Sequence, residues 1–168
     1  DRMRWFQTAY WDRVHSVRVS EKKWCVLRYP NASMAIMAGK PTSTFEDFYY
    51  KVCNLDYASL SLAMDPLVEL MKKTDRVRIA GPGTDISFSI AGIGAVKCDG
   101  TRNVPDGEVY SCPKRDSVNG VITYNAATMY QGKKFEGIRF EVKDGRIEKA
   151  TCQSNTEDLN RILDTDEG

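Results

Sequence analysis

Histidine is nearly absent from this sequence, which contains a single one, His15, among 168 residues. With no second histidine, neither a histidine-rich zinc site nor a serine-histidine-aspartate triad can be assembled within the chain. The GxSxG sequence of many serine hydrolases and the phosphate-binding P-loop are also missing. We expect His15 to be an ordinary residue on the surface or interface of a helix.

Cysteine occurs five times, but the count is odd, the spacing is wide and no CxxC pair is present. This pattern argues against a disulfide framework and against a structural zinc site, which needs paired ligands a few residues apart. Cys25 and Cys112 lie in apolar, strand-like runs. We expect these residues to be small, buried side chains in a reducing compartment.

Long apolar runs and an excess of one charge are missing as well. The longest apolar runs are a few residues, whereas a helix needs roughly 20 to span a membrane. Lysine and arginine total 24, aspartate and glutamate total 23, and the formal charge is +1, so there is no basic footprint for nucleic acid. We therefore predict a soluble, cytoplasmic protein that binds neither nucleic acid nor membranes.

The first part of the chain has the apolar periodicity of helices. Spacings of three and four predict helices over residues 2–19, 45–53 and 57–73. A short apolar run over residues 23–29 predicts one strand, and residues 42–44 offer N-caps for the second helix. The side chains expected to face inward on the third helix are Leu60, Ala63, Leu67, Leu70 and Met71. The aromatic side chains expected to pack on these helices are Trp5, Trp11, Tyr49 and Tyr50.

The second part of the chain changes to a period of two residues, which predicts antiparallel strands. Strands are expected on both sides of a GPGTD turn and on both sides of Asp144-Gly145, whose sequence is typical of a tight hairpin. The sequence therefore predicts a mixed fold, with an α/β layer over residues 1–74 and an α+β, mainly antiparallel part over residues 75–168. Because the sequence starts inside a helical pattern and stops where another element would begin, we expect a segment of a longer protein.

The stretch NVPDGEVYSCP, residues 103–113, is the strongest candidate for a functional loop. Pro105 stiffens the approach, the next two residues make an Asp-Gly turn, and Val109 begins a strand, which leaves Glu108 at the junction. Glu108 can be an exposed turn residue or a metal ligand, and Glu167 in DTDEG can be a first-turn acid of a following helix or a second ligand. Carboxylates are preferred by divalent cations, and one carboxylate can bridge two ions.

Five blocks of sequence, in a fixed order, resemble the thermophilic metallo-aminopeptidase family, the type that includes aminopeptidases T and S and PepS. The blocks are GTDISFS, NVPDGEVYSCP, GVITYN, FEVKDGRIEKA and LNRILDTDEG. RYPNASMAIMAG and TFEDFYYKVC are similar to further parts of that family, so the resemblance covers nearly the whole chain. It implies that residues 1–74 end an N-terminal α/β domain and that residues 75–168 begin a catalytic domain.

The resemblance also implies a function and a set of ligands. Glu108 and Glu167 match two metal-binding glutamates of a dinuclear site, whose other ligands, histidines and an aspartate, lie in blocks beyond DTDEG. The implied enzyme uses two divalent ions (cobalt, zinc or magnesium) and an activated water to remove N-terminal residues from peptides, and it forms a homodimer. Because the later blocks are not in this sequence, we expect the chain alone to bind metal weakly or not at all and to be inactive.

Two further polar residues and one alternative function remain. Asn103 is expected to orient the Glu108 loop without itself binding the metal. Asp85 is expected to be a turn residue whose side chain bonds nearby backbone. The alternative is a non-catalytic module that binds peptides or a partner protein. A natural chain that continues past Gly168 with two histidines and an aspartate would favour the enzyme, and one that stops there would favour the binding module.

Overall fold

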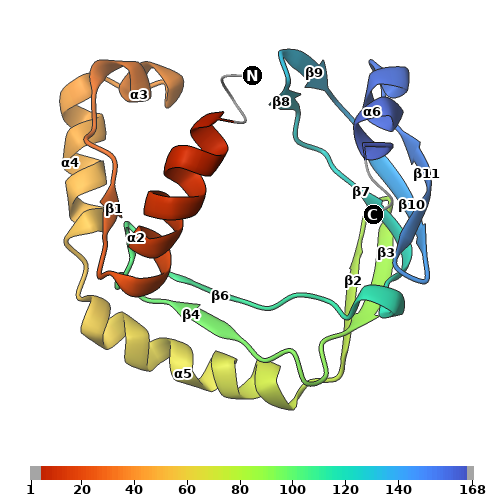
Figure 1. Ribbon diagram of the computed structural model, residues 1–168, viewed down its shortest axis with the longest axis horizontal. Coiled ribbons are helices and arrows are strands. Elements are labelled where there is room, and N and C mark those ends of the chain that lie inside the picture. Colours follow the sequence, from red (N-terminus) through yellow and green to blue (C-terminus); the bar gives the residue numbers. More distant parts are fainter. Residues whose placement is uncertain (1–4, 166–168) are drawn as a thin grey trace. The chain divides into compact units, whose positions relative to one another are not determined.

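The computed structural model describes residues 5–165, which divide into two compact units. Unit 1 comprises the residues up to Pro66 together with Val96–Val109, and unit 2 comprises Leu67–Ala95 together with the residues from Tyr110 onward. Helices and an antiparallel sheet are both present, which confirms the predicted mixed fold class (Figure 1). The predicted domain division after residue 74 stays a prediction. In the described part of the chain, no helix is long and apolar enough to cross a bilayer.

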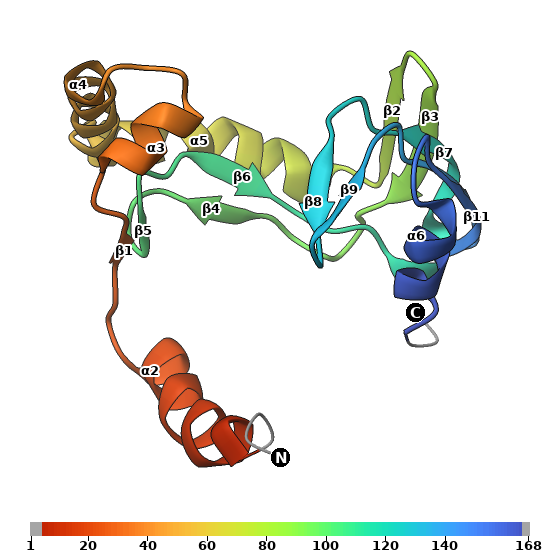
Figure 2. The same ribbon diagram turned by 90° about the horizontal axis from the view of Figure 1, so that it is seen from above.

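Unit 1 consists mainly of helices, with α5 and β6 continuing into unit 2. In chain order its elements are η1 (Gln7–His15, a π-helix), α2 (Ser16–Glu21), β1 (Val26–Leu27), α3 (Ala32–Met37), α4 (Thr42–Cys53), α5 (Tyr57–Lys73), β4 (Val96–Cys98), β5 (Asn103–Val104) and β6 (Glu108–Tyr110). β1 and β5 form a parallel pair, and β4 and β6 form a second ribbon of two strands (Figure 2). The predicted strand over residues 23–29 is shorter in the structure, where only β1 forms, because it pairs with only two residues of β5.

The predicted N-terminal helix is confirmed as η1 followed by α2, but the predicted packing of its tryptophans is wrong. Neither element contains a buried residue, and Trp5 and Trp11 are 71% and 42% exposed. Among the described residues, the main neighbour of η1 is α2, which continues it. The Trp11 ring stacks on His15, with 4.0 Å between the ring centroids. Tyr49, in contrast, packs beside the buried Phe45 with ring centroids 5.9 Å apart.

The start of α4 differs from the sequence prediction. The helix begins at Thr42, and the residues predicted as caps form its first turn. Pro41 occupies the capping position without a side-chain hydrogen bond, and its carbonyl accepts the Phe45 N–H at 3.0 Å. The proline before Thr42 already has the extended backbone that a cap requires, so the helix starts three residues earlier than predicted.

α5 confirms the predicted helix, but its inward stripe matches the prediction only in part. Met64 and Val68 are buried, at 8% exposure each, and Leu60 and Met71 are partly buried on the same stripe. Spacings of four, four and three residues place these four positions along one face. The other residues predicted to face inward are exposed: Ala63, Leu67 and Leu70. The helix therefore carries two neighbouring apolar stripes, of which only one is covered.

Unit 2 is built on an antiparallel sheet. Its elements are β2 (Arg76–Gly81), β3 (Thr84–Ser89), η2 (Arg115–Ser117, a 3-10 helix), β7 (Asn119–Thr123), β8 (Thr128–Tyr130), β9 (Lys133–Phe135), β10 (Arg139–Lys143), β11 (Arg146–Thr151) and α6 (Thr156–Leu163). The strand order is β11-β10-β7-β3-β2, and each neighbouring pair is antiparallel, as predicted. Phe135, Ala150 and Leu159 form a buried core between β9, β11 and α6 (Figure 1).

One turn prediction in unit 2 is correct and another is wrong. Asp144 and Gly145 have φ angles of 48° and 79°, as a tight hairpin of the primed type requires, and they join β10 to β11. Asp85 lies in β3 and does not bond the turn backbone. Its carboxylate accepts two hydrogen bonds from the Arg78 guanidinium, both 2.8 Å long, because the register makes the two residues diagonal neighbours on paired strands.

The cysteines are all free thiols. Cys25 and Cys112 are exposed, so the prediction that they are buried is wrong. Cys25 precedes the two-residue β1 and Cys112 follows the three-residue β6, so neither lies in a strand at the centre of a sheet.

We predict that Gly120→Ala strongly destabilises unit 2. Gly120 has a φ of 128°, and an added Cβ would lie 2.2 Å from the Asp85 carbonyl oxygen on the neighbouring strand. Backbone strain and forced separation of β3 from β7 should lower the free energy of unfolding by about 2–4 kcal/mol, measured by chemical unfolding.

Gly81→Ala is the control, because an added Cβ there meets no atom within 4 Å. We expect it to change the free energy of unfolding by less than about 1 kcal/mol. Equal losses in the two variants would contradict the role given to the close approach of β3 and β7.

Candidate functional site

Glu108, the predicted metal ligand, is the first residue of β6 and is exposed. β6 pairs with β4, and both strands run beside the first half of α5 (Figures 1 and 2). Asn103 is the first residue of β5 and pairs with Val26 of β1. The loop between β5 and β6, which contains a cis bond between Val104 and Pro105, therefore presents Glu108 at its far end.

Hydrogen bonds tie this loop to the start of α5. The Gly100 N–H donates to Asp106 Oδ2 at 2.9 Å, and the Asp106 N–H donates to the Tyr57 hydroxyl at 3.2 Å. The same hydroxyl donates to the Val52 carbonyl of α4 at 3.2 Å. The loop is therefore closed on itself between residues 100 and 106 and is fastened to two helices.

Glycine is required at two positions of the loop. Gly100 has a φ of 83°, and an added Cβ would lie 2.6 Å from the Tyr57 ring, so both space and conformation exclude a side chain. Gly107 has a φ of 137°, and its Cβ would make an ordinary contact with Leu60 at 3.6 Å, so conformation alone requires glycine there. The turn predicted at Asp106-Gly107 thus brings the backbone close to α5 just before Glu108.

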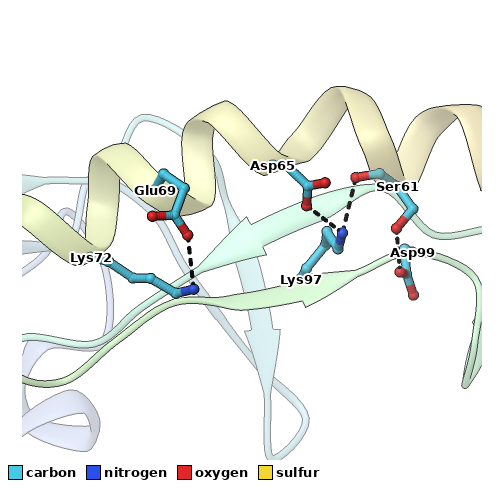
Figure 3. A network of polar contacts seen from close by, with 6 residues as sticks. All are labelled: Ser61, Asp65, Glu69, Lys72, Lys97 and Asp99. Atoms are coloured by element: carbon cyan, nitrogen blue, oxygen red, sulfur yellow. Dashed lines mark hydrogen bonds and ion pairs between the residues drawn. The ribbon is translucent and has the colours of Figure 1, made fainter.

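Three polar contacts fasten β4, and Asp99 directly after it, to α5 (Figure 3). Lys97 Nζ lies 2.6 Å from Asp65 Oδ1 and donates to the Ser61 carbonyl at 3.0 Å. The Ser61 hydroxyl donates to Asp99 Oδ2 at 2.7 Å. This hydrogen bond is the main reason why the pKa of Asp99 lies below its ordinary value, and it outweighs the opposing effect of burial.

The surroundings of Glu108 are acidic. Burial raises the pKa of the Cys98 thiol, and the charges of Asp106 and Glu108, together with a hydrogen bond to Glu108, raise it further. The two carboxylates therefore lie close to the end of β4. A concentration of negative charge favours a cation, but no group of three or more histidine, cysteine, aspartate or glutamate side chains in the described chain is arranged to hold a metal ion. These residues do not complete a metal site by themselves.

Two of the three predicted site residues, Asn103 and Glu108, lie in the described part of the chain. Asn103 and Glu108 begin two strands that are consecutive in the chain but belong to different ribbons, and the hydrogen bonds of the described residues do not join them. Glu167 lies outside the described residues. The metal roles of both glutamates and the orienting role of Asn103 stay predictions. Sequence reasoning missed Tyr57, because it lies 49 residues from Asp106 in the sequence and no local pattern connects the two.

Comparison with known proteins gives a family match. The model of the thermophilic metalloprotease (M29) family matches residues 5–168. Aminopeptidase T of Thermus thermophilus is 34% identical over 97 residues, which cover 52% of this chain and 24% of that protein. Aminopeptidase 2 of Geobacillus stearothermophilus is 33% identical over 66 residues, which cover 39% of this chain and 16% of that protein.

Two solved structures are similar to this chain in fold. AmpT from Thermus thermophilus matches with a TM-score of 0.73 and 23% identity, over 96% of this chain and 45% of that chain. A 2,5-dihydroxypyridine dioxygenase from Pseudomonas putida KT2440 matches with a TM-score of 0.53 and 17% identity, over 82% of this chain and 43% of that chain. At these identities the similarity concerns the fold alone. The chain spans less than half the length of either structure.

We predict that Ser61→Ala raises the pKa of Asp99 toward the ordinary value, because the variant lacks the hydroxyl that stabilises the ionised carboxylate. A carbon NMR titration of the side-chain carboxyl measures the shift. A depressed folded-state pKa means that Asp99 stabilises the fold above the unfolded pKa of about 4 and that this contribution is lost as the pH falls through the folded pKa. Ser61→Ala should reduce that acid-dependent part of the stability.

Ser59→Ala is the matched control. The Ser59 hydroxyl and N–H donate to the Asp56 carboxylate and lower the pKa of Asp56. We expect Ser59→Ala to raise the pKa of Asp56 alone and Ser61→Ala to raise the pKa of Asp99 alone. If either substitution shifted both carboxyl groups equally, the local hydrogen bonds could not be the cause.

Proposed function

The chain belongs to the thermophilic metalloprotease (M29) family, and we propose that it forms part of a metallo-aminopeptidase, an enzyme that removes N-terminal residues from peptides. The relatives named aminopeptidases support the reaction class. Because the chain spans less than half of its solved relative, the proposal concerns the whole natural protein that contains this sequence. Peptides with a free amino terminus are the proposed substrates, and a cytoplasmic homodimer is the proposed form.

The observation that carries the proposal is the position of Glu108. Its carboxylate is exposed at the start of β6, directly after a loop that hydrogen bonds hold to α5. An exposed carboxylate on an ordered loop can bind a cation without first losing a buried partner. Hard oxygen ligands of this kind suit divalent ions such as magnesium, zinc and cobalt.

The described residues supply too few donors to complete a metal site. We propose that Glu108 and Glu167 provide two carboxylates of a dinuclear site and that histidines and an aspartate from elsewhere in the natural protein complete it. When bound, divalent ions in such a site supply an acidified water and stabilise negative charge on a carbonyl oxygen. The part of this chain is to hold the Glu108 carboxylate in place, with Asn103 proposed to help orient its loop.

We predict that Glu108→Gln abolishes peptide hydrolysis in the whole natural protein. The amide keeps the shape of the side chain but lacks the negative charge that a metal ligand supplies, so kcat/KM should fall by at least about 100-fold and metal affinity should fall with it. Hydrolysis of aminoacyl chromogenic substrates and calorimetric metal titration measure the two effects. Glu148→Gln, an exposed glutamate of β11, is the control and should leave both unchanged. Normal activity of Glu108→Gln would refute the ligand assignment.

We also predict that the 168-residue chain by itself cleaves no aminoacyl chromogenic substrate, whichever of cobalt, zinc or magnesium is added. The physical reason is the incomplete donor set, since two carboxylates without further ligands bind divalent ions weakly. The whole natural protein, assayed in parallel, should be active with at least one of these ions. Robust turnover by the isolated chain would show that the ligand set proposed here is wrong.

A further inference from the structure

The Tyr57 hydroxyl makes two different hydrogen bonds at the start of α5. It donates to the Val52 carbonyl and accepts the Asp106 N–H, both at 3.2 Å. A phenol can fill both roles because its oxygen is a donor and an acceptor, whereas backbone carbonyl and N–H groups can fill only one each. The hydroxyl therefore connects the end of α4 to the loop before Glu108.

The Asp106 side chain continues this connection. Its carboxylate accepts the Gly100 N–H at 2.9 Å, and Gly100 itself lies against the Tyr57 ring so closely that only glycine fits. The backbone of Asp106 is thus fixed by Tyr57, and its side chain is fixed by a residue that Tyr57 also contacts. The three residues form a closed set, in which each one restricts the other two.

This set lies next to the predicted metal ligand. Only Gly107 separates Asp106 from Glu108, and on the other side Glu108 enters β6, which pairs with β4. The backbone of Glu108 is therefore held from both directions, by strand pairing after it and by the anchored aspartate before it. A ligand held in this way binds a metal without the entropy cost of ordering its loop.

We propose that Tyr57 and Asp106 are positioning residues for Glu108, which hold its loop in the arrangement that binds the metal. The inference rests on the proposed function, in which Glu108 is a ligand, and it adds two residues that do not themselves touch the metal. Outer hydrogen-bonding partners of metal ligands typically change metal affinity by 10–100-fold when they are removed.

Tyr57→Phe in the whole natural protein tests the proposal. The variant keeps the ring against Gly100 and removes only the hydroxyl. We expect the metal dissociation constant, measured by calorimetry, to rise about 10-fold, while KM for an aminoacyl substrate at saturating metal stays unchanged. Hydrogen exchange of the Asp106 amide in the metal-free protein should become faster, which reports the lost anchor without reference to activity. Tyr124→Phe is the matched control in unit 2 and should change none of these quantities.

A pair of substitutions at Asp106 separates positioning from direct ligation. Asp106→Asn retains an oxygen that accepts the Gly100 N–H and should keep metal affinity within about threefold of the wild type, whereas Asp106→Ala should lose about 10-fold. An equal, large loss in both variants would make Asp106 a ligand and overturn the positioning role. This pair also decides the matter if Tyr57→Phe does not fold.

The failure of the inference differs from the failure of the proposed function. If the wild-type protein binds no divalent metal and cleaves no aminoacyl substrate, the proposed function is wrong and the inference falls with it. If the wild-type protein does both, and Tyr57→Phe and Asp106→Ala bind the metal with unchanged affinity, the proposed function stands and the positioning role is wrong.

Discussion

The Tyr57 ring lies against the backbone at Gly100, and the geometry of the candidate site depends on that contact. A Cβ at Gly100 would come within 2.6 Å of the ring, so the chain after β4 approaches α5 more closely than a side chain would allow. At this distance the Tyr57 hydroxyl reaches the Asp106 N–H, and the Asp106 carboxylate closes back on Gly100. A missing side chain at one position therefore determines the backbone two residues before Glu108.

Features of the fold that depend on nearby residues could be predicted from the sequence. The hairpin at Asp144-Gly145 follows from two residues that tolerate positive φ, and the extent of α5 follows from apolar spacing. The buried stripe of α5 could be predicted only in part. Leu60 and Met71 lie on it as predicted, but packing against other segments buries Met64 and Val68 and leaves the predicted Leu67 exposed. The ion pair of Asp85 with Arg78 exists only once β2 and β3 have paired in register, so a local reading as a turn residue was wrong.

The candidate site also has features that nearby residues predict and features that depend on distant residues. Pro105 and the Asp-Gly turn indicate from local chemistry that Glu108 stands where a loop becomes a strand, and the structure agrees. The anchor of this loop, Tyr57, is 49 residues away from Asp106 in sequence, and no local pattern connects them. The proposed ligand role of Glu108 rests on a resemblance spread over five blocks, because a single glutamate beside a glycine has many ordinary uses.

Three carboxylates near the end of β4 differ in how their oxygens are used, and this difference bears on which one is offered to a cation. Asp99 accepts the Ser61 hydroxyl and Asp106 accepts the Gly100 N–H, so either group would have to break or share a good hydrogen bond in order to turn toward an ion. Glu108 is exposed, and within the described part of the chain its carboxylate accepts no hydrogen bond comparable to those of Asp99 and Asp106. The free-energy cost of redirecting a carboxylate is therefore smallest at Glu108. This ranking depends on hydrogen bonds alone, and it favours the same residue as the family resemblance.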